Sequence, residues 1–195
     1  PPLTRTNQQT LGVIGVGRIG TAVINRMKAF GYRIIGYDPY QPSGHEKAIG
    51  YERKQHLKKL LEESDIVTLH CPLSSETKGL VDDEFIATMK PGSMLVNTGR
   101  GPVLSDLDCV EKYLRSGHLS AVSFDVLPQE PPPVDHSLIN AWRNNEEWIV
   151  GRVIINPHSS YYSEQSLFEM RYKASETVRM FLEEGELRNQ VLTSK

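Results

Sequence analysis

Short runs of apolar and β-branched residues alternate along the chain with polar-rich segments of helical periodicity. Each short run is typical of a buried strand. Six strands are expected, at residues 11–15, 33–37, 66–70, 93–97, 121–125 and 153–156. Because strands that alternate with helices form βαβ units, the pattern predicts an α/β fold. We expect a doubly wound parallel sheet with helices on both faces.

Apolar spacing and capping residues predict the helices. After the first strand, apolar residues recur on one helical face, at Ile19, Val23, Met27 and Phe30. Gly31 follows them and is expected to end this helix. Ser105 and Asp108 resemble a capping box, which would open a helix that ends near Arg115.

The C-terminal part of the chain contains one long predicted helix, at residues 163–184. Its apolar stripe is expected to pack in the core: Leu167, Met170, Ala174, Val178 and Phe181. The stretch 127–152 is less regular, and a short helix is expected near 138–143. Such a long connection is usually functional, and a lid, a dimer contact and a plain surface excursion all remain open.

Composition narrows the classes of function. The chain has 195 residues, 38% of them hydrophobic and 24% charged, with a net charge of −2, which fits one globular domain. Near-neutral charge argues against a direct nucleic-acid partner. No apolar run reaches the length of about 20 residues that spans a bilayer, so no membrane role is expected. Cys71 and Cys109 form no CxxC pair, which argues against zinc and predicts a reducing cytoplasmic location.

A glycine-rich loop joins the first strand to the first helix. It consists of Gly15, Val16, Gly17, Arg18, Ile19 and Gly20. Glycines in this order allow a tight turn, close approach to a pyrophosphate and close helix packing, although they could also form only a turn. Asp38 follows the second strand, 18 residues after Gly20, where a carboxylate accepts hydrogen bonds from a ribose. The carboxylate would repel a 2′-phosphate, so the sequence favours NAD over NADP.

Four further motifs occur in order at the ends of predicted strands. They are HCPLSSET at 70–77, NTGRG at 97–101, FDVLPQEP at 124–131 and NPHSSYYSEQ at 156–165. With the glycine loop, they make residues 10–192 similar to the NAD-dependent D-isomer-specific 2-hydroxyacid dehydrogenases. The YSEQ segment and the EMR at 169–171 most resemble the C-terminal-binding-protein branch of that family.

The resemblance implies three catalytic residues. Arg100 would hold the substrate carboxylate, Glu130 would orient the histidine, and His158 would transfer the proton. The chemistry asks for these residue types, because an imidazole exchanges protons near neutral pH and a guanidinium binds a carboxylate through two parallel hydrogen bonds. Taken singly, each residue also has a structural interpretation, as a surface charge, a loop acid or a strand-end residue.

The resemblance also places further residues around the dinucleotide. Near the adenosine and pyrophosphate it places Cys71, Pro72 and Thr77. Near the nicotinamide it places Thr98 and Asp125, and beside the carboxamide Ser160 and Tyr161. Tyr161 stands where the eukaryotic C-terminal-binding proteins carry a tryptophan, so their substrate preference is not carried over.

Members of the family are longer than this chain and contain a second, substrate-binding domain. We therefore expect residues 1–184 to form an NAD-binding Rossmann domain and 185–195 to be a tail leading back to a substrate-binding domain that is largely absent. Such a chain would bind NAD and turn over poorly by itself. The leading hypothesis is an oxidoreductase for a D-2-hydroxy acid or 2-keto acid. The alternative is an NAD(H)-sensing, corepressor-like scaffold, and a homodimer is expected in either case.

Overall fold

The computed structural model describes residues 4–188 and 190. The chain divides into two compact units, the first ending at His158 and the second beginning at Ser159. The first unit holds all the strands of the described chain and every α-helix except α7 (Glu164–Glu184).

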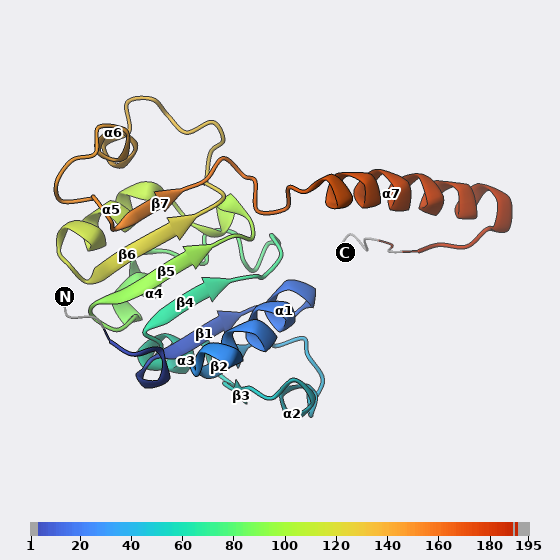
Figure 1. Ribbon diagram of the computed structural model, residues 1–195, viewed down its shortest axis with the longest axis horizontal. Helices are drawn as coiled ribbons and strands as arrows, with labels where there is room; N and C mark the ends of the chain where they lie inside the picture. Colours follow the sequence, from blue (N-terminus) through green and yellow to red (C-terminus); the bar gives the residue numbers. More distant parts are fainter. Residues whose placement is uncertain (1–3, 189, 191–195) are drawn as a thin grey trace. The chain divides into compact units, whose positions relative to one another are not determined.

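A seven-stranded sheet forms the centre of the first unit (Figure 1). All of its neighbouring strands pair in parallel, in the order β3-β2-β1-β4-β5-β6-β7. The strands are β1 (Thr10–Ile14), β2 (Arg33–Tyr37), β3 (Glu52–Arg53), β4 (Ile66–Leu69), β5 (Ser93–Asn97), β6 (Leu119–Phe124) and β7 (Val153–Ile155). The predicted doubly wound α/β fold is confirmed, and β3 is a strand that the sequence did not predict.

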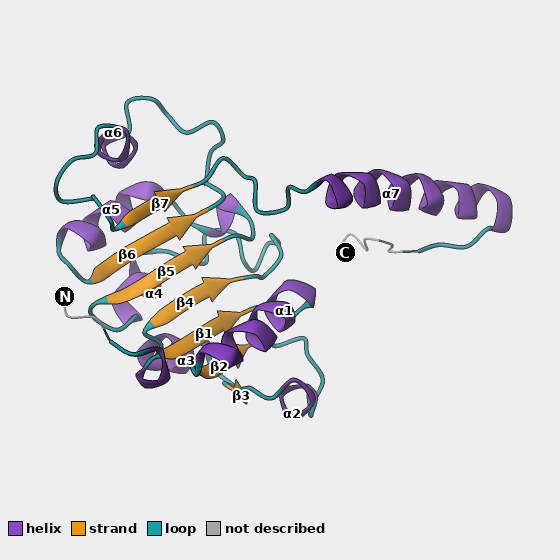
Figure 2. Ribbon diagram, viewed as in Figure 1, coloured by secondary structure: helices purple, strands orange, loops and turns teal. Residues whose placement is uncertain are grey.

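Helices lie on both faces of this sheet (Figure 2). They are α1 (Arg18–Met27), α2 (His45–Ile49), α3 (Leu57–Glu63), α4 (Asp83–Thr88), α5 (Leu107–Arg115) and α6 (Ser137–Arg143). In Figure 2, α1 crosses in front of the strands, whereas α3, α4 and α5 lie behind them. The short helix expected near 138–143 is present as α6.

Two apolar clusters hold the helices to the sheet, because side chains alternate between the two faces of each strand. Val13 of β1 packs with Ile24 of α1 in one cluster. Ile14, the next residue of β1, packs in the other cluster with Leu60 of α3 and Phe85 of α4. Each face of the sheet therefore has its own core.

The predicted face of α1 is buried in part, because Val23 and Met27 pack against the cluster that contains Val13 and Ile24, whereas the first and last residues of that face do not. Ile19 and Phe30 are each 62% exposed, and Gly20 and Ile24 are the buried residues of the helix. A Cβ on Gly20 would lie 2.1 Å from the Gly15 carbonyl oxygen, so the helix backbone itself packs against the glycine loop. This close approach turns Ile19 outward, toward solvent. Gly31 does end the segment, with a φ of 83°.

The N-terminus of α5 also differs from the prediction. Asp106, not Ser105, is the N-cap, and its carboxylate accepts a 2.8 Å hydrogen bond from the backbone N–H of Cys109. Either residue type caps helices well, and the one whose side chain reaches the third helical N–H takes the position. The predicted end of this helix, Arg115, is correct.

The second unit contains α7, which begins after Ser163 in a capping box with Ser166 and ends at Gly185 in the left-handed conformation. The predicted helix is confirmed, but the prediction that its stripe lies in a core is wrong. Met170, Val178 and Phe181 are all more than half exposed. Within the described residues of this unit no other helix or strand is present to cover them. Apolar periodicity marks a face for packing and does not say what covers it.

None of the helices in the described chain combines the length and the hydropathy needed to cross a bilayer.

Candidate functional site

The glycine loop after β1 has the three properties that a dinucleotide loop needs. Gly15 has a φ of 84°, and a Cβ there would lie 2.5 Å from the backbone nitrogen of Cys71. A Cβ on Gly17 would meet nothing within 4 Å, so the backbone at this position is open to a ligand. Gly17 is also the N-cap of α1, where backbone N–H groups of Arg18 and Ile19 begin the helix. The loop therefore fits a pyrophosphate.

Asp38 follows β2 and is tied to the same loop. One carboxylate oxygen accepts a 2.8 Å hydrogen bond from the Val16 N–H, and the other accepts a 3.0 Å bond from the Tyr40 N–H. Each carboxylate oxygen can accept more than one hydrogen bond, so the group can still receive ribose hydroxyls. The position of the acid is thus set by the glycine loop beside it.

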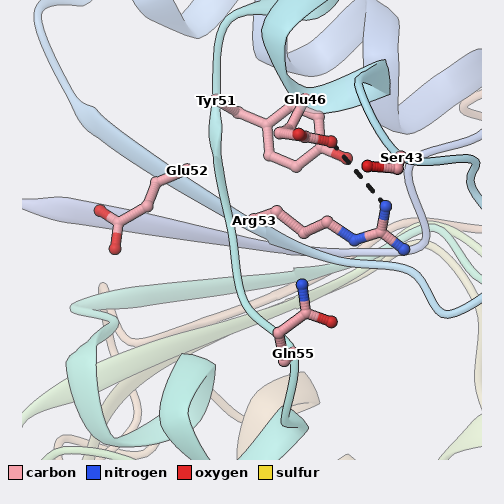
Figure 3. A pocket seen from close by; sticks show the side chains of 6 residues that line it. All are labelled: Ser43, Glu46, Tyr51, Glu52, Arg53 and Gln55. Atoms are coloured by element: carbon pink, nitrogen blue, oxygen red, sulfur yellow. Dashed lines mark ion pairs between the residues drawn. The ribbon is translucent and has the colours of Figure 1, made fainter.

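Arg53 of β3 anchors the loop that carries Asp38, and the sequence did not point to it. Its guanidinium donates to the carbonyl oxygens of Asp38 at 3.3 Å, Gln41 at 2.9 Å and Pro42 at 3.1 Å. Figure 3 shows the side chain extending toward Glu46, 3.8 Å away, while the neighbouring Glu52 points to the opposite side. These residues line a cavity of about 490 Å³. No sequence motif could have revealed Arg53, because its partners are backbone carbonyls.

The segment after β4 lies beside the glycine loop, at the point where the sheet order changes direction between β1 and β4. Parallel sheets bind ligands at such a point. Cys71 is buried there, and burial raises the pKa of its thiol. Pro72 is exposed, and its carbonyl accepts a 2.5 Å hydrogen bond from the Thr77 hydroxyl. Thr77 thus stabilises this loop through a hydrogen bond from its side chain to the loop backbone.

His70 follows the same strand and is kept neutral by its surroundings. Burial lowers its pKa to about 4. Its Nε2 lies 3.0 Å from the Thr68 hydroxyl, and its Nδ1 is buried without a hydrogen-bond partner in the described chain.

The turn after β5 presents Arg100. Asn97 is fully buried and shapes this turn, because its side chain donates to the Arg100 carbonyl and accepts from the Gly99 N–H, both at 3.0 Å. Thr98 lies half-buried between them. Arg100 itself is exposed, and its guanidinium donates to the Gly99 carbonyl at 2.8 Å. Asn97 is a second positioning residue that the sequence argument did not single out.

Backbone hydrogen bonds join the ends of β5, β6 and β7. The N–H of Asp125, a buried residue after β6, donates to the Asn97 carbonyl at 3.0 Å. The Asp125 carbonyl in turn accepts a 2.9 Å bond from the N–H of His158. Close packing adds a further constraint, since a Cβ on Gly101 would lie 1.8 Å from the Leu127 carbonyl oxygen.

Glu130 and His158 form the polar pair of this edge. One carboxylate oxygen of Glu130 accepts from the Leu127 N–H, and the other lies 2.8 Å from Nδ1 of His158. A carboxylate at Nδ1 fixes the proton there, so Nε2 is the ring nitrogen left to accept or donate a proton. His158 has a φ of 53°, in the left-handed region that few residues other than glycine adopt, although histidine adopts it more often than most.

Ser160 and Tyr161 belong to the second unit, and both are exposed. Their expected place at a nicotinamide carboxamide stays a prediction, as do the roles of the other predicted site residues and the predicted boundary between residues 184 and 185.

Among the described residues, a group of possible metal ligands lies elsewhere, at Asp108, Glu111 and His136. Nδ1 of His136 accepts a hydrogen bond from the Leu138 N–H, which places the ring proton on Nε2, 3.2 Å from Asp108. Glu111 is paired with Arg115. The group is therefore satisfied as a network of hydrogen bonds and ion pairs between α5 and α6.

Comparisons with known proteins agree with this geometry. A family model described as the NAD binding domain of D-isomer specific 2-hydroxyacid dehydrogenases matches residues 1–160. A glyoxylate reductase of Korarchaeum cryptofilum is 38% identical over 173 residues, which cover 89% of this chain and 49% of that protein. C-terminal-binding protein 1 of Caenorhabditis elegans is 34% identical over 171 residues, 87% of this chain and 22% of that protein.

Solved structures give the same result. A D-lactate dehydrogenase from Aquifex aeolicus, complexed with NAD and lactic acid, matches with a TM-score of 0.75 and 32% identity over 92% of this chain and 55% of its own. A glyoxylate reductase described as from Paecilomyes thermophila matches with a TM-score of 0.81 and 29% identity over 96% of this chain and 53% of its own. The chain thus spans about half the length of these enzymes, and about half or less of the curated relatives it matches.

Proposed function

Because the chain belongs to the D-isomer specific 2-hydroxyacid dehydrogenases, as their NAD-binding domain, we propose that it binds NAD(H) and supplies the proton-transfer residues of a dehydrogenase for a D-2-hydroxy acid or 2-keto acid. The observation that carries the proposal is the Glu130–His158 pair, held by backbone hydrogen bonds beside the turn that presents Arg100. NAD is the cofactor of this family's domain.

The cofactor-binding residues of the proposal are those around the glycine loop. Gly15, Gly17 and Gly20, with Arg18 and Ile19, would hold the pyrophosphate, and the open space over Gly17 supports this fit. Asp38 would bind the ribose. Cys71, Pro72 and Thr77 would line the adenosine side, and Thr98, Asp125, Ser160 and Tyr161 would lie at the nicotinamide. Arg53 is a positioning residue, since it holds the loop that carries Asp38.

In the proposed reaction the bound cofactor supplies or accepts a hydride at C2 of the substrate. Arg100 binds the substrate carboxylate through parallel hydrogen bonds and so fixes the orientation of C2. In the direction of reduction, Nε2 of His158 donates a proton to the carbonyl oxygen. Glu130 holds Nδ1–H and stabilises the imidazolium when the reaction runs in the direction of oxidation.

The test is a fluorescence titration of this chain with NADH, together with an NADH-oxidation assay over a panel of 2-keto acids. Saturable NADH binding is expected. Oxidation of NADH that depends on a keto acid, and that His158→Gln abolishes while NADH binding is retained, would support the catalytic part. Turnover retained in His158→Gln would remove His158 from the mechanism.

The second candidate is an NAD(H)-sensing scaffold, which the similarity to C-terminal-binding protein 1 favours. Dinucleotide would then shift an oligomerisation equilibrium, because it binds the assembled state better than the monomer. An NADH-dependent change of mass, together with NADH binding but no keto-acid-dependent turnover in either this chain or a full-length version, would favour this candidate. Membership of the C-terminal-binding-protein-like branch is part of the same proposal.

A homodimer and a cytoplasmic location complete the proposal, with no direct nucleic-acid or membrane partner. The sheet face that carries Met94 and Ile154 supports the homodimer, since both side chains are exposed and apolar. The two cysteines are free thiols, which supports a reducing compartment.

A further inference from the structure

A side-chain hydrogen bond joins the two loops on either side of the glycine loop. In the sheet, β1 lies between β2 and β4, so the loops after β2 and β4 flank the loop after β1 (Figure 1). Tyr40 belongs to the first of these loops and Glu76 to the second. The Tyr40 hydroxyl donates a hydrogen bond to the Glu76 carboxylate, across 36 positions of sequence. This bond therefore fixes the position of the Glu76 carboxylate relative to the glycine loop.

Tyr40 donates hydrogen bonds to two carboxylates. Its backbone N–H donates a 3.0 Å hydrogen bond to Asp38, and its hydroxyl donates to Glu76. The length of one tyrosine side chain thus sets the separation of the two acids. Asp38 is the proposed acceptor of the ribose hydroxyls, so Glu76 lies about one tyrosine side chain away from the ribose site. Two negative charges from different loops are therefore held near one end of the proposed dinucleotide site.

The negative charge of Glu76 is not neutralised by the fold. Glu76 takes part in no ion pair within residues 4–188 and 190, and its partner Tyr40 is a neutral donor. Hydrogen bonding to Glu76 raises the pKa of the Tyr40 phenol, so the phenol stays protonated at neutral pH. The loop does not need this carboxylate for its shape, because the Thr77 hydroxyl accepts from the Ser74 N–H at 2.8 Å and donates to the Pro72 carbonyl. The carboxylate is thus free to act on a ligand through its charge.

We propose that Glu76 is a specificity-determining residue for the dinucleotide and that Tyr40 is its positioning residue. The charge of Glu76 adds to that of Asp38 at the ribose end of the site. A 2′-phosphate would meet repulsion from both carboxylates, whereas a 2′-hydroxyl carries no charge to be repelled. NADPH is then rejected by two acids from different loops. This inference rests on the proposed binding of NAD(H), and it extends the discrimination to the loop after β4.

Fluorescence titrations with NADH and with NADPH test this inference. Glu76→Gln retains the size of the side chain and removes its charge. It is expected to lower the Kd for NADPH about threefold and to change the Kd for NADH less than about twofold, because exposed charges interact weakly in water. Tyr40→Phe removes only the hydroxyl that holds Glu76, so the Kd for NADPH should fall less than in Glu76→Gln. Glu147→Gln is the matched control, since Glu147 is exposed and precedes β7 at the opposite edge of the sheet from β3, and it should leave both Kd values unchanged.

Salt separates an effect of charge from a change in the shape of the loop. The ratio of the two Kd values is expected to differ between the unchanged chain and Glu76→Gln at an ionic strength of about 0.01 M. The difference should disappear at about 1 M, where charges are screened beyond about 3 Å. Equal ratios at low salt, or a difference that persists at high salt, would overturn this inference while NADH binding stands. Absence of saturable NADH binding to the unchanged chain would overturn the proposed function, and this inference with it.

Discussion

Single side chains at the dinucleotide loop hold backbone groups as well as facing a ligand. Asp38 accepts from Val16 and Tyr40 N–H groups, so its carboxylate is already oriented for the ribose that we propose it binds. Asp38→Ala is expected to weaken NADH binding by about tenfold and to reduce the preference for NADH over NADPH, because both the acceptor and the repulsion of a 2′-phosphate are lost. Fluorescence titration with both cofactors measures this. Asp83→Ala, at an exposed acid of α4, is the matched control.

Arg53 also holds the loop that carries Asp38, through hydrogen bonds to its carbonyl oxygens. Arg53→Gln removes donors to three carbonyl oxygens, those of Asp38, Gln41 and Pro42, and is expected to weaken NADH binding several-fold through a displaced Asp38. Arg53→Lys retains the charge but lacks the planar set of donors. Its NADH affinity is expected to lie between that of Arg53→Gln and that of the unchanged chain. If Arg53→Gln lowers thermal stability but leaves the ratio of NADH to NADPH affinity unchanged, Arg53 serves the fold alone.

His70 makes stability depend on pH. Burial lowers its pKa from the ordinary value of 6.5 to about 4, so the unfolded chain binds the proton more tightly than the folded chain does. This contribution to stability is fully present above pH 6.5 and is lost as the pH falls toward 4, at a cost of about 3 kcal/mol. Urea unfolding at a series of pH values is the measurement. In His70→Asn the free energy of unfolding should fall less between pH 7 and pH 4 than in the unchanged chain. An equal fall in both proteins would contradict the role given to His70.

At the scale of elements, one glycine is required for packing and another leaves space for a ligand. A Cβ on Gly101 would overlap the Leu127 carbonyl, whereas one on Gly17 would meet nothing within 4 Å. Gly101→Ala is therefore expected to cost about 2 kcal/mol or more of unfolding free energy. Gly17→Ala is expected to leave the thermal midpoint nearly unchanged and to weaken NADH binding. A stable Gly101→Ala, or a Gly17→Ala with full NADH affinity, would contradict these roles.

Elements with a strong pattern could be predicted from the sequence, and those held by backbone contacts could not. The bounds of β2 and β5 agree with the prediction, since each apolar run has clear polar or glycine neighbours. The strand β3 has only Glu52 and Arg53, two charged residues that pair through the backbone at the sheet edge. No apolar alternation exists in such a strand.

The residues of the candidate site also fall into those that the sequence could predict and those that it could not. Residue types in motifs could be recognised, as for Gly15, Asp38 and the Glu130–His158 pair. The supporting residues were missed, because Arg53 and Asn97 act on carbonyl and N–H groups whose positions depend on the folded chain. The exposed face of α7 shows the opposite error, in which a pattern was recognised correctly and no packing partner is described in its unit.

At the scale of the whole molecule, the exposed apolar side chains of β5 and β7 support a proposed homodimer. Light scattering of the chain is expected to give twice the mass of the monomer. Ile154→Glu is expected to give the monomer, since a charge would be buried in the interface. Lys112→Glu, at an exposed position of α5, is the matched control and should leave the mass unchanged. A monomeric chain at high concentration would contradict the proposal.

The hydrogen bonds from His158 to Asp125 and from Asp125 to Asn97 are made entirely by main-chain atoms. The bonds that space the three strand ends therefore need no particular side chain. Exposed side chains beside these strand ends can change while this main-chain framework is kept. Directed evolution at the loops after β5 and β6 can exploit this property, since new side chains there start from backbone positions that are already aligned.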